Sequence, residues 1–318
     1  MAWTRRNFIA ASALFSLTVR EGAANNKQPG GDLGPNRLVL LGTRGGPAIE
    51  GYIPSPSANL IVYKNMPYII DAGYGATFKL IEAGVPLSRL RYVFITHHHS
   101  DHNLDLGPML YNAWVSGLPG PIDVFGPKGL NDLIGGYWLS NRYDIETRIS
   151  DEGRPDLRKL VHTHEFKEGL IFSRGDVTVS ALRVIHPPVT ESYAFRFVLG
   201  RKIIVFSGDT AYFPPLADFA RGADYLVHEV VYPSAIDTLL KGRPNVDAAK
   251  LKASILRHHT RPEEAGRIAT RAHAKTLVLN HFVPADEKAL TPSVWAHAVK
   301  QTYSGKIVVG RDLLHLPL

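Results

Sequence analysis

The sequence predicts an α/β fold in which two packed β-sheets form one domain with helices on the outside. Short apolar segments typical of strands come first and then alternate with helical segments, and this order is repeated in the second half of the chain. No internal repeat and no Pro- or Ser-rich linker interrupts residues 37–318. The chain has 318 residues, 45% of them hydrophobic and 20% charged, which is enough for one large domain.

The expected elements follow one another in a regular order. A strand at residues 38–41 runs into a glycine-rich turn at 42–47, and a hairpin covers 59–63 and 68–71. A helix at 76–83 then precedes a strand at 92–95. Further strands are expected at residues 122–125, 177–185, 194–199, 202–206, 225–231, 276–279 and 306–309, and further helices at 130–137, 262–272 and 291–302.

The amino terminus has the pattern of an export signal. Residues 4–9, Thr-Arg-Arg-Asn-Phe-Ile, match the twin-arginine pattern, and an apolar stretch and small residues follow them. We therefore predict a twin-arginine signal peptide at residues 1–24, recognised by the twin-arginine export machinery, and a flexible segment at 25–36. A short amphipathic helix is the alternative. No stretch reaches the roughly 20 apolar residues that a membrane span needs, so we expect a periplasmic or secreted protein without a stable membrane anchor after cleavage.

The composition excludes some kinds of site. The chain contains no cysteine, so it can form neither disulfides nor thiolate–metal bonds. The formal net charge of +7 comes from scattered Lys and Arg residues, without the dense basic runs typical of nucleic-acid binding. This mild positive excess is compatible with an anionic substrate.

Residues 96–102, Thr-His-His-His-Ser-Asp-His, carry the strongest functional signal. They follow an expected strand and contain four potential metal ligands: His97, His99, Asp101 and His102. Because side chains alternate between the faces of a strand, His97 and His99 are expected to serve one ion, while the two residues carried round by the turn serve a second. Imidazole and carboxylate ligands suit zinc, and also manganese or iron. The alternative is a surface histidine cluster, in which an aspartate at a fixed place is unusual.

Two metal ions need more ligands than one loop supplies, and three residues at the ends of other expected strands are candidates. His186 ends the strand at 177–185, and His281 follows the one at 276–279. Asp209 follows a glycine, which permits close approach of the backbone, and its carboxylate can bridge two cations. Each residue alone is more often structural, but together with the histidine cluster they indicate a binuclear site.

These motifs resemble the metallo-β-lactamase superfamily, and the similarity covers roughly residues 37–318. The resemblance implies a four-layer αβ/βα sandwich with two divalent metal ions, zinc or alternatively manganese or iron, along one edge. It implies a first metal held by His97, His99 and His186, and a second held by Asp101, His102 and His281, with Asp209 bridging them. Asp71 resembles the family's aspartate that orients ligands, although a turn-forming role is equally compatible with the local sequence.

Two further motifs resemble the ribonuclease Z and arylsulfatase branch of the superfamily. Residues 225–231 contain a His-Glu pair at a strand end, and residues 259–266 resemble a His-Ser/Thr motif that opens a helix. The resemblance implies that Glu229 orients and charges His259, which protonates the leaving group as a general acid. The neighbouring His258 is a less favoured alternative, and His228 is as compatible with a structural role. The candidate catalytic residues are therefore Asp101, Glu229 and His259.

We expect an exported hydrolase of small anionic esters, above all aryl sulfates or phosphodiesters, that uses a hydroxide bridging the two metals. The absence of cysteine argues against the commonest β-lactamase subclass. A lactonase or β-lactamase-like hydrolase and a non-catalytic metal-binding family member remain alternatives. The sequence does not distinguish sulfate, phosphate and lactone substrates, does not identify the native metal, and leaves a homodimer open.

A ribonuclease Z-like endonuclease is a further alternative. The resemblance to ribonuclease Z implies a long protruding arm that holds transfer RNA. This arm would be inserted between the third metal-ligand motif and the bridging aspartate. Here the 22 residues at 187–208 separate His186 from Asp209, and one expected hairpin accounts for them. Nucleic acid is therefore not expected as a partner.

Two expectations concern substrate contacts. Arg44, in the glycine-rich turn, would pair with a sulfate or phosphate oxygen if it faces the metals, and a solvated loop position is the alternative. The aromatic residues of the segment 111–143 are candidates for a wall over the site, with ordinary packing as the alternative. The residues proposed for this wall are Trp114, Tyr137, Trp138 and Tyr143.

Overall fold

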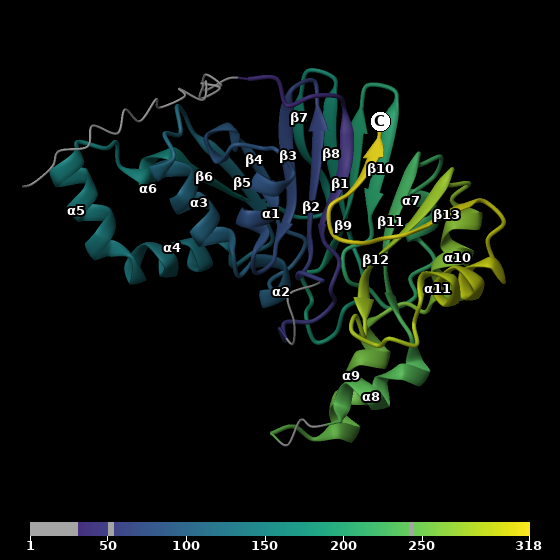
Figure 1. Cartoon of the computed structure of the whole chain (residues 1–318). Coiled ribbons are helices and arrows are strands. Elements are labelled where there is room, and N and C mark those ends of the chain that lie inside the picture. The colour runs from purple at the N-terminus through teal and green to yellow at the C-terminus, as the bar shows by residue number, and fades with distance from the viewer. Residues whose placement is uncertain (1–30, 50–53, 242–244) are drawn as a thin grey trace, which may run out of the picture. The chain divides into compact units, whose positions relative to one another are not determined.

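The computed structural model describes residues 31–49, 54–241 and 245–318. Residues 32–318 form one compact unit that contains two seven-stranded β-sheets (Figure 1). The predicted signal peptide at 1–24 and part of the predicted flexible segment at 25–36 lie outside the described residues. The two-sheet α/β architecture predicted from the sequence is confirmed.

The first sheet is built from the N-terminal half of the chain and one strand from the C-terminus. Its strands, in spatial order, are β14 (Leu314–Pro317), β1 (Arg37–Gly42), β2 (Ala58–Tyr63), β3 (Met66–Ala72), β4 (Tyr92–Phe94), β5 (Ile122–Gly126) and β6 (Val161–Glu165). The strands from β3 to β6 run parallel to one another. Their carboxyl ends therefore meet at one edge of this sheet.

The second sheet is built from the C-terminal half. Its strands, in spatial order, are β13 (Lys306–Val309), β12 (Thr276–Val283), β11 (Tyr225–Val231), β10 (Lys202–Phe206), β9 (Tyr193–Leu199), β8 (Val177–Arg183) and β7 (Gly169–Arg174). The strands from β10 to β13 are parallel. Ligands commonly bind outside the carboxyl ends of parallel strands, so each half of the chain supplies one edge suited to a functional site.

The sheets pack through alternating side chains. In β1, Leu38 and Leu40 face the second sheet, while Val39 and Leu41 face the helices. Phe94 of β4 and Phe197 of β9 meet across the interface with ring centroids 5.2 Å apart. Each such fully buried apolar side chain contributes about 1.5–3 kcal/mol to stability, so this aromatic layer fixes how the two sheets sit on each other.

Helices cover the outer faces, which completes the predicted four-layer arrangement (Figure 1). Helices on the side of the first sheet are α1 (Ala76–Glu82), α2 (Ser100–Asn103), α3 (Leu106–Val115), α4 (Leu130–Ser140), α5 (Arg142–Glu152) and α6 (Leu157–Leu160), with the 3₁₀ turn η1 (Leu87–Arg89). On the side of the second sheet lie α7 (Leu216–Phe219), α10 (Pro262–Arg271) and α11 (Pro292–Lys300). No helix among the described residues is both long and apolar enough to cross a membrane.

The hairpin formed by α8 (Ile236–Leu240) and α9 (Ala248–His258) follows the 3₁₀ turn η2 (Pro233–Ala235) and projects from the sandwich at the bottom of Figure 1. The sequence analysis does not predict these two helices, nor the strands β6, β7 and β14. Most side chains of β7 are exposed, so its sequence lacks a clear buried face. Strand β12 extends four residues beyond the predicted end at 279, so that His281 lies within it.

Candidate metal centre

The histidine-rich segment leaves the carboxyl end of β4 and enters the short helix α2. His97 and His99 lie in the loop, and Asp101 and His102 lie in the single turn of α2. His97, Asp101 and His102 are buried, and His99 is half-buried. The loop after β4 and the turn into α2 thus bring the four side chains to one place.

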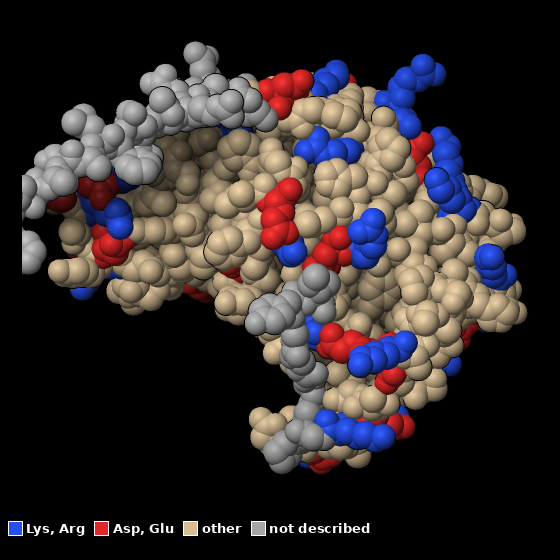
Figure 2. Space-filling model, in the orientation of Figure 1, with Lys and Arg blue, Asp and Glu red and all other residues tan. Residues whose placement is uncertain are grey.

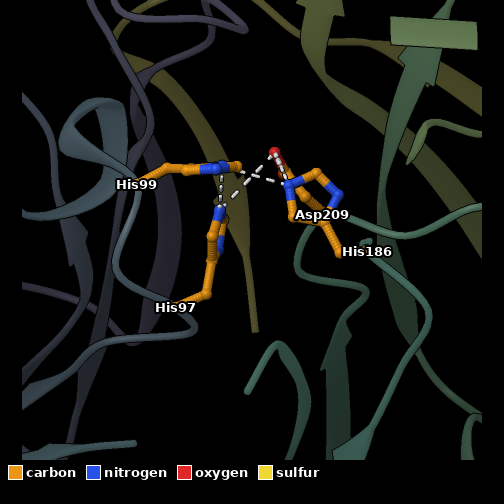
Figure 3. A group of neighbouring side chains, drawn as sticks. All are labelled: His97, His99, His186 and Asp209. Atoms are coloured by element: carbon orange, nitrogen blue, oxygen red, sulfur yellow. Dashed lines mark hydrogen bonds and ion pairs between the residues drawn. The ribbon is translucent and has the colours of Figure 1, made fainter. Parts of the chain in front are cut away.

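The first group of donors surrounds a single point (Figure 3). His99 Nδ1 lies 3.1 Å from His97 Nε2 and 3.1 Å from His186 Nε2. Asp209 Oδ2 lies 3.9 Å from both of those Nε2 atoms. The structure therefore brings together the residues predicted for the first metal, together with the predicted bridging carboxylate.

The second group shares Asp209 with the first. Asp209 Oδ2 lies 3.4 Å from His102 Nε2 and 3.2 Å from His281 Nε2. Asp101 Oδ2 lies 3.3 Å from His281 Nε2 and 3.7 Å from His102 Nε2. All seven predicted ligands thus lie in two adjacent groups, with one carboxylate in both.

The donor chemistry fits divalent cations. His99 Nδ1 faces the Nε2 atoms of two other histidines. This nitrogen carries either one proton or one lone pair, so it cannot form a hydrogen bond with both neighbours. His102 Nε2 and Asp209 Oδ1 are buried without a hydrogen-bond partner among the described residues. Buried polar atoms normally have a hydrogen-bond partner or bind a metal ion. A cation that accepts the lone pairs of these two atoms would supply the missing partner. The nitrogen and oxygen donors suit zinc, manganese or iron.

Burial and neighbouring charges set the protonation of this cluster. Burial holds the pKa of His97 well below its usual value and lowers the pKa of His186 to about 4, so both rings are neutral with a free lone pair. Burial opposes ionisation of Asp209, but the charges of His281 and His102 outweigh it and hold the pKa of Asp209 well below its usual range. His97 and His186 therefore face the ionised Asp209 as neutral imidazoles. For His102 and His281, burial disfavours protonation, but the charge of Asp209 outweighs it and raises their pKa, so a metal ion held there would displace a proton from each ring.

Asp71 lies at the end of β3 and orients the histidine-rich segment. Its Oδ1 accepts a hydrogen bond of 2.8 Å from the Thr96 backbone amide, and its Oδ2 lies 2.8 Å from His102 Nδ1. Because Asp71 engages Nδ1 of His102, Nε2 of that ring is directed to the centre. The structure thus places Asp71 where the resemblance implies an orienting aspartate.

The glycine-rich loop after β1, predicted to act through Arg44, instead contacts the site through its glycines. Gly46 donates its backbone amide to Asp101 Oδ2 at 2.8 Å. Gly45 passes so close to His281 that an added Cβ would lie 2.7 Å from its Nδ1. Only glycine fits at position 45, and the run of glycines in the sequence is the signal that could have indicated such an approach.

Glu229 and His259 form a pair beside the two donor groups. His259 Nδ1 lies 3.1 Å from Glu229 Oε2, and Glu229 Oε1 accepts a hydrogen bond of 2.8 Å from the Thr260 amide. The His259 ring stacks on the His281 ring with centroids 5.6 Å apart. Burial raises the pKa of Glu229 well above its usual value and lowers that of His259 to about 4, which favours one shared proton on the pair.

The two alternative histidines occupy other positions. His228 is buried and its Nδ1 lies 2.8 Å from the Glu229 carbonyl oxygen, in keeping with a structural role. His258 ends α9, and its backbone carbonyl lies 3.2 Å from His186 Nδ1, so that it helps to fix the ring of a predicted ligand. The His258 side chain lies 3.2 Å from Ser254 Oγ.

A cavity of about 340 Å³ opens onto both donor groups. Its lining comes from the loop after β1, the histidine-rich segment, β12 and the α8–α9 hairpin. Arg44 lines the cavity, but its Nη2 forms an ion pair of 2.6 Å with Asp286 and its Nε donates to the Pro54 carbonyl. Its guanidinium is therefore largely engaged within the protein and does not supply a free charge for substrate.

The predicted aromatic wall over the site is wrong. None of the four aromatic side chains lines the cavity at the donor groups. Tyr137 and Trp138 line a separate cavity between α3 and α4, where the Tyr137 ring packs over Gly107. Trp114 is buried in the core beside the first sheet, and Tyr143 is exposed. Trp114, Tyr137 and Trp138 thus pack against helices, and none of the four lines the cavity at the site.

The segment between His186 and Asp209 contains the β9–β10 hairpin, as predicted, and no protruding arm. On the face shown in Figure 2, Lys and Arg residues lie interspersed with Asp and Glu residues. The described residues on this face therefore form no continuous basic stripe of the kind that binds many phosphates of a nucleic acid.

Comparisons with known proteins give a consistent result. A family model described as "Anti-Pycsar protein Apyc1" matches residues 37–275. A ribonuclease Z from Mycobacterium bovis is 30% identical over 279 residues, which cover 87% of this chain and 96% of that protein. A ribonuclease Z from Mycobacterium marinum is similar to the same extent.

Solved structures share the fold. The metallo-β-lactamase fold protein YhfI from Bacillus subtilis superposes with a TM-score of 0.66 at 21% identity, covering 89% of this chain and 99% of that one. The short form of human tRNase Z gives a TM-score of 0.62 at 21% identity, covering 88% and 98%. A diphosphatase of the PhnP family gives 0.57 at 15% identity, covering 89% and 98%.

Proposed function

The chain belongs to the metallo-β-lactamase-fold hydrolases, in the family that the Anti-Pycsar protein Apyc1 model describes, and on that premise we propose that it is a metal-dependent phosphodiesterase. Relatives such as those from Mycobacterium bovis and Mycobacterium marinum are named ribonuclease Z, a class of enzyme that hydrolyses phosphodiesters. The comparisons therefore favour the ribonuclease Z-like alternative over the aryl sulfate expectation.

The observation that carries this proposal is the shared position of Asp209, within 4 Å of ligand atoms in both donor groups. We propose two zinc ions. The first would be held by His97, His99, His186 and Asp209, and the second by Asp101, His102, His281 and Asp209. Divalent cations held there would polarise the phosphodiester and make a nucleophilic water available near neutral pH.

The protein's own residues complete the chemistry. Glu229 engages His259 Nδ1, which leaves the other ring nitrogen to hold a proton for the departing oxygen. His259 lines the cavity between the two donor groups and α9, within reach of an ester bound at the centre. Asp71 and the His258 carbonyl hold the rings of His102 and His186, so the reacting groups are positioned before the substrate arrives.

We propose small phosphodiesters as the substrate in preference to precursor transfer RNA. The segment between His186 and Asp209 carries one hairpin, and the cavity of about 340 Å³ is of the size that holds a small ligand. We also propose, from the sequence of residues 1–24, that the protein is exported by the twin-arginine route to the periplasm or beyond.

The test is a substrate panel on the purified protein with measured metal content. The panel contains bis(p-nitrophenyl) phosphate, p-nitrophenyl sulfate, a lactone, nitrocefin and a precursor transfer RNA. We expect the phosphodiester to be hydrolysed and the activity to be lost on chelation and restored by zinc or manganese. Turnover of the sulfate or the lactone by a metal-loaded sample that leaves the phosphodiester intact would overturn the proposal, and efficient cleavage of the transfer RNA would overturn the preference for small substrates.

A further inference from the structure

One face of helix α9 lines the cavity. Leu251, Ser254, Ile255 and His258 all contribute to the lining, and they are spaced at i, i+3, i+4 and i+7. Residues at this spacing lie on one side of an α-helix. Helix α9 therefore presents a single continuous face to the metal centre.

The cavity wall on this side is apolar. Leu239 of α8, Leu251 and Ile255 of α9, and Val283 and Ala285 at the end of β12 all line the cavity. We call Leu239, Leu251, Ile255 and Val283 the apolar wall. Removing apolar surface from water is favourable, so the apolar wall is suited to bind an apolar group of a ligand and not a charged group.

We propose that the apolar wall binds the leaving group of the ester, so that the enzyme prefers phosphodiesters with a flat or apolar leaving group. The inference rests on the proposed phosphodiesterase function. His259 directly follows α9 as its C-cap residue, so the group that takes a proton from His259 departs beside the last turn of this helix. From there the leaving group extends along the face that carries Ile255 and Leu251.

The charges of the cavity agree with a substrate that carries one negative charge. Arg44 is the sole Lys or Arg among the described residues that line it, and Arg44 is ion-paired with Asp286 at 2.6 Å. A phosphomonoester or a polyphosphate chain carries further charge that would find no free cationic side chain among the described residues of the lining. A diester has one charge, which cations held by the two donor groups would neutralise.

The wall is fixed in place by the packing of the hairpin. Val231, Ile236 and Val283 form a small buried cluster against which Ile255 and Leu256 pack. The N-terminus of α9 is capped by Asp247, whose side chain accepts from the Lys250 amide at 3.0 Å. At the other end, the His258 carbonyl contacts the ring of His186. The apolar wall is therefore held against both the second sheet and the metal centre.

The test compares Leu251→Ser and Ile255→Ser with Leu256→Ser as the matched control. Leu256 lies on the same helix and is half-buried, but it packs toward the small buried cluster and does not line the cavity. Methyl p-nitrophenyl phosphate and bis(p-nitrophenyl) phosphate share one leaving group and differ in the group that stays on phosphorus. Binding of diphenyl phosphate, measured by calorimetry, is the readout that does not depend on turnover.

We expect each wall variant to raise KM about tenfold for both esters with little change in kcat, because an apolar contact to the leaving group is lost. Diphenyl phosphate should bind about tenfold more weakly, while Leu256→Ser behaves like the wild type. A loss confined to bis(p-nitrophenyl) phosphate would place the retained group on the wall and overturn the assignment. Unchanged KM and unchanged diphenyl phosphate binding in both wall variants would show that substrate does not contact the wall.

The same experiment separates this inference from the proposed function. If the metal-loaded wild type hydrolyses neither ester, the phosphodiesterase proposal fails. Weaker binding of diphenyl phosphate by the wall variants would then still locate an apolar group on α9, and equal binding would overturn that location as well.

Discussion

Asp71 and His281 are both left out of their strand ladders by a one-residue irregularity. In the β2–β3 pair the partners step from Ile70 to Ala72, and in the β11–β12 pair they step from Asn280 to Phe282. The omitted residues have left-handed backbones, with φ of 62° for Asp71 and 47° for His281. A bulge of this kind re-aims a side chain, and here one bulge in each sheet turns a polar group toward the same centre.

Replacement of Asp71 by Asn is expected to weaken metal binding without disturbing the backbone. Asn tolerates a left-handed conformation as Asp does, so the bulge should persist. The neutral amide holds His102 Nδ1 less strongly, and loss of such an orienting contact typically costs 10- to 100-fold in metal affinity. Competition with a metal-binding dye measures the affinity. An unchanged affinity would show that Asp71 only forms the turn.

Replacement of Gly45 by Ala is expected to displace His281. The added Cβ would lie 2.7 Å from His281 Nδ1 and 2.4 Å from Val283 Cγ2, so the ring or the loop must shift. Metal analysis should then show less than two bound metal ions per protein, because the second donor group contains His281. Activity should fall at least about tenfold. Gly135→Ala in α4 is the control, because an added Cβ there meets nothing within 4 Å. Equal metal content in both variants would contradict the proposed role of the close approach.

Replacement of Asp209 by Ala is expected to remove most metal binding and activity, because both donor groups lose a ligand. We expect a loss of activity of about 100-fold or more. Bound ion should also stabilise the fold, by about 2.7 kcal/mol at a concentration 100 times the dissociation constant. Chelation should therefore lower the thermal midpoint of the wild type by roughly 5 °C. The same chelator should leave the midpoint of Asp209→Ala almost unchanged, and an equal shift in both proteins would refute a shared role for Asp209.

Replacement of His259 by Ala is expected to affect esters according to their leaving group. An alkyl leaving group needs a proton, so its hydrolysis should fall by about 100-fold or more. A p-nitrophenyl group departs as a stable anion and should be affected far less. Glu229→Gln should show the same pattern more weakly, because the ring loses its carboxylate partner. Equal losses with both kinds of leaving group would argue for a positioning role in place of proton donation.

Replacement of Arg5 and Arg6 by Lys is expected to block export. The twin-arginine pathway reads the arginine pair, and lysine keeps the charge while removing the pattern. Fractionation of cells that express the full chain measures the distribution of the protein. Undiminished accumulation outside the cytoplasm would mean that residues 1–24 act in another way.

The local patterns of the sequence predicted most strands of the two sheets and identified all seven donor residues as candidates. A run such as His97 to His102 after an apolar strand is visible without any long-range information, and so are His186 and Asp209 at strand ends. The two bulges were not predicted, because they depend on which residues pair across neighbouring strands.

Contacts between distant segments explain the errors. Arg44 is engaged by Asp286, 242 residues further along the chain, which no local pattern indicates. The aromatic residues of α3 and α4 pack between helices, where amphipathic spacing and a substrate wall look alike in sequence. The α8–α9 hairpin escaped prediction because many of its residues are exposed and polar, although Asp247 is a recognisable helix cap.

The donor residues are divided between the two sheets, with the histidine-rich segment on one and His186, Asp209 and His281 on the other. The spacing of the reactive groups thus depends on the thickness of the aromatic layer around Phe94 and Phe197. A change of side-chain volume in that layer would alter the distances between the donor atoms of the two sheets, although no residue of the site is replaced. Laboratory evolution toward new esters should therefore recover substitutions deep between the sheets as well as around the pocket.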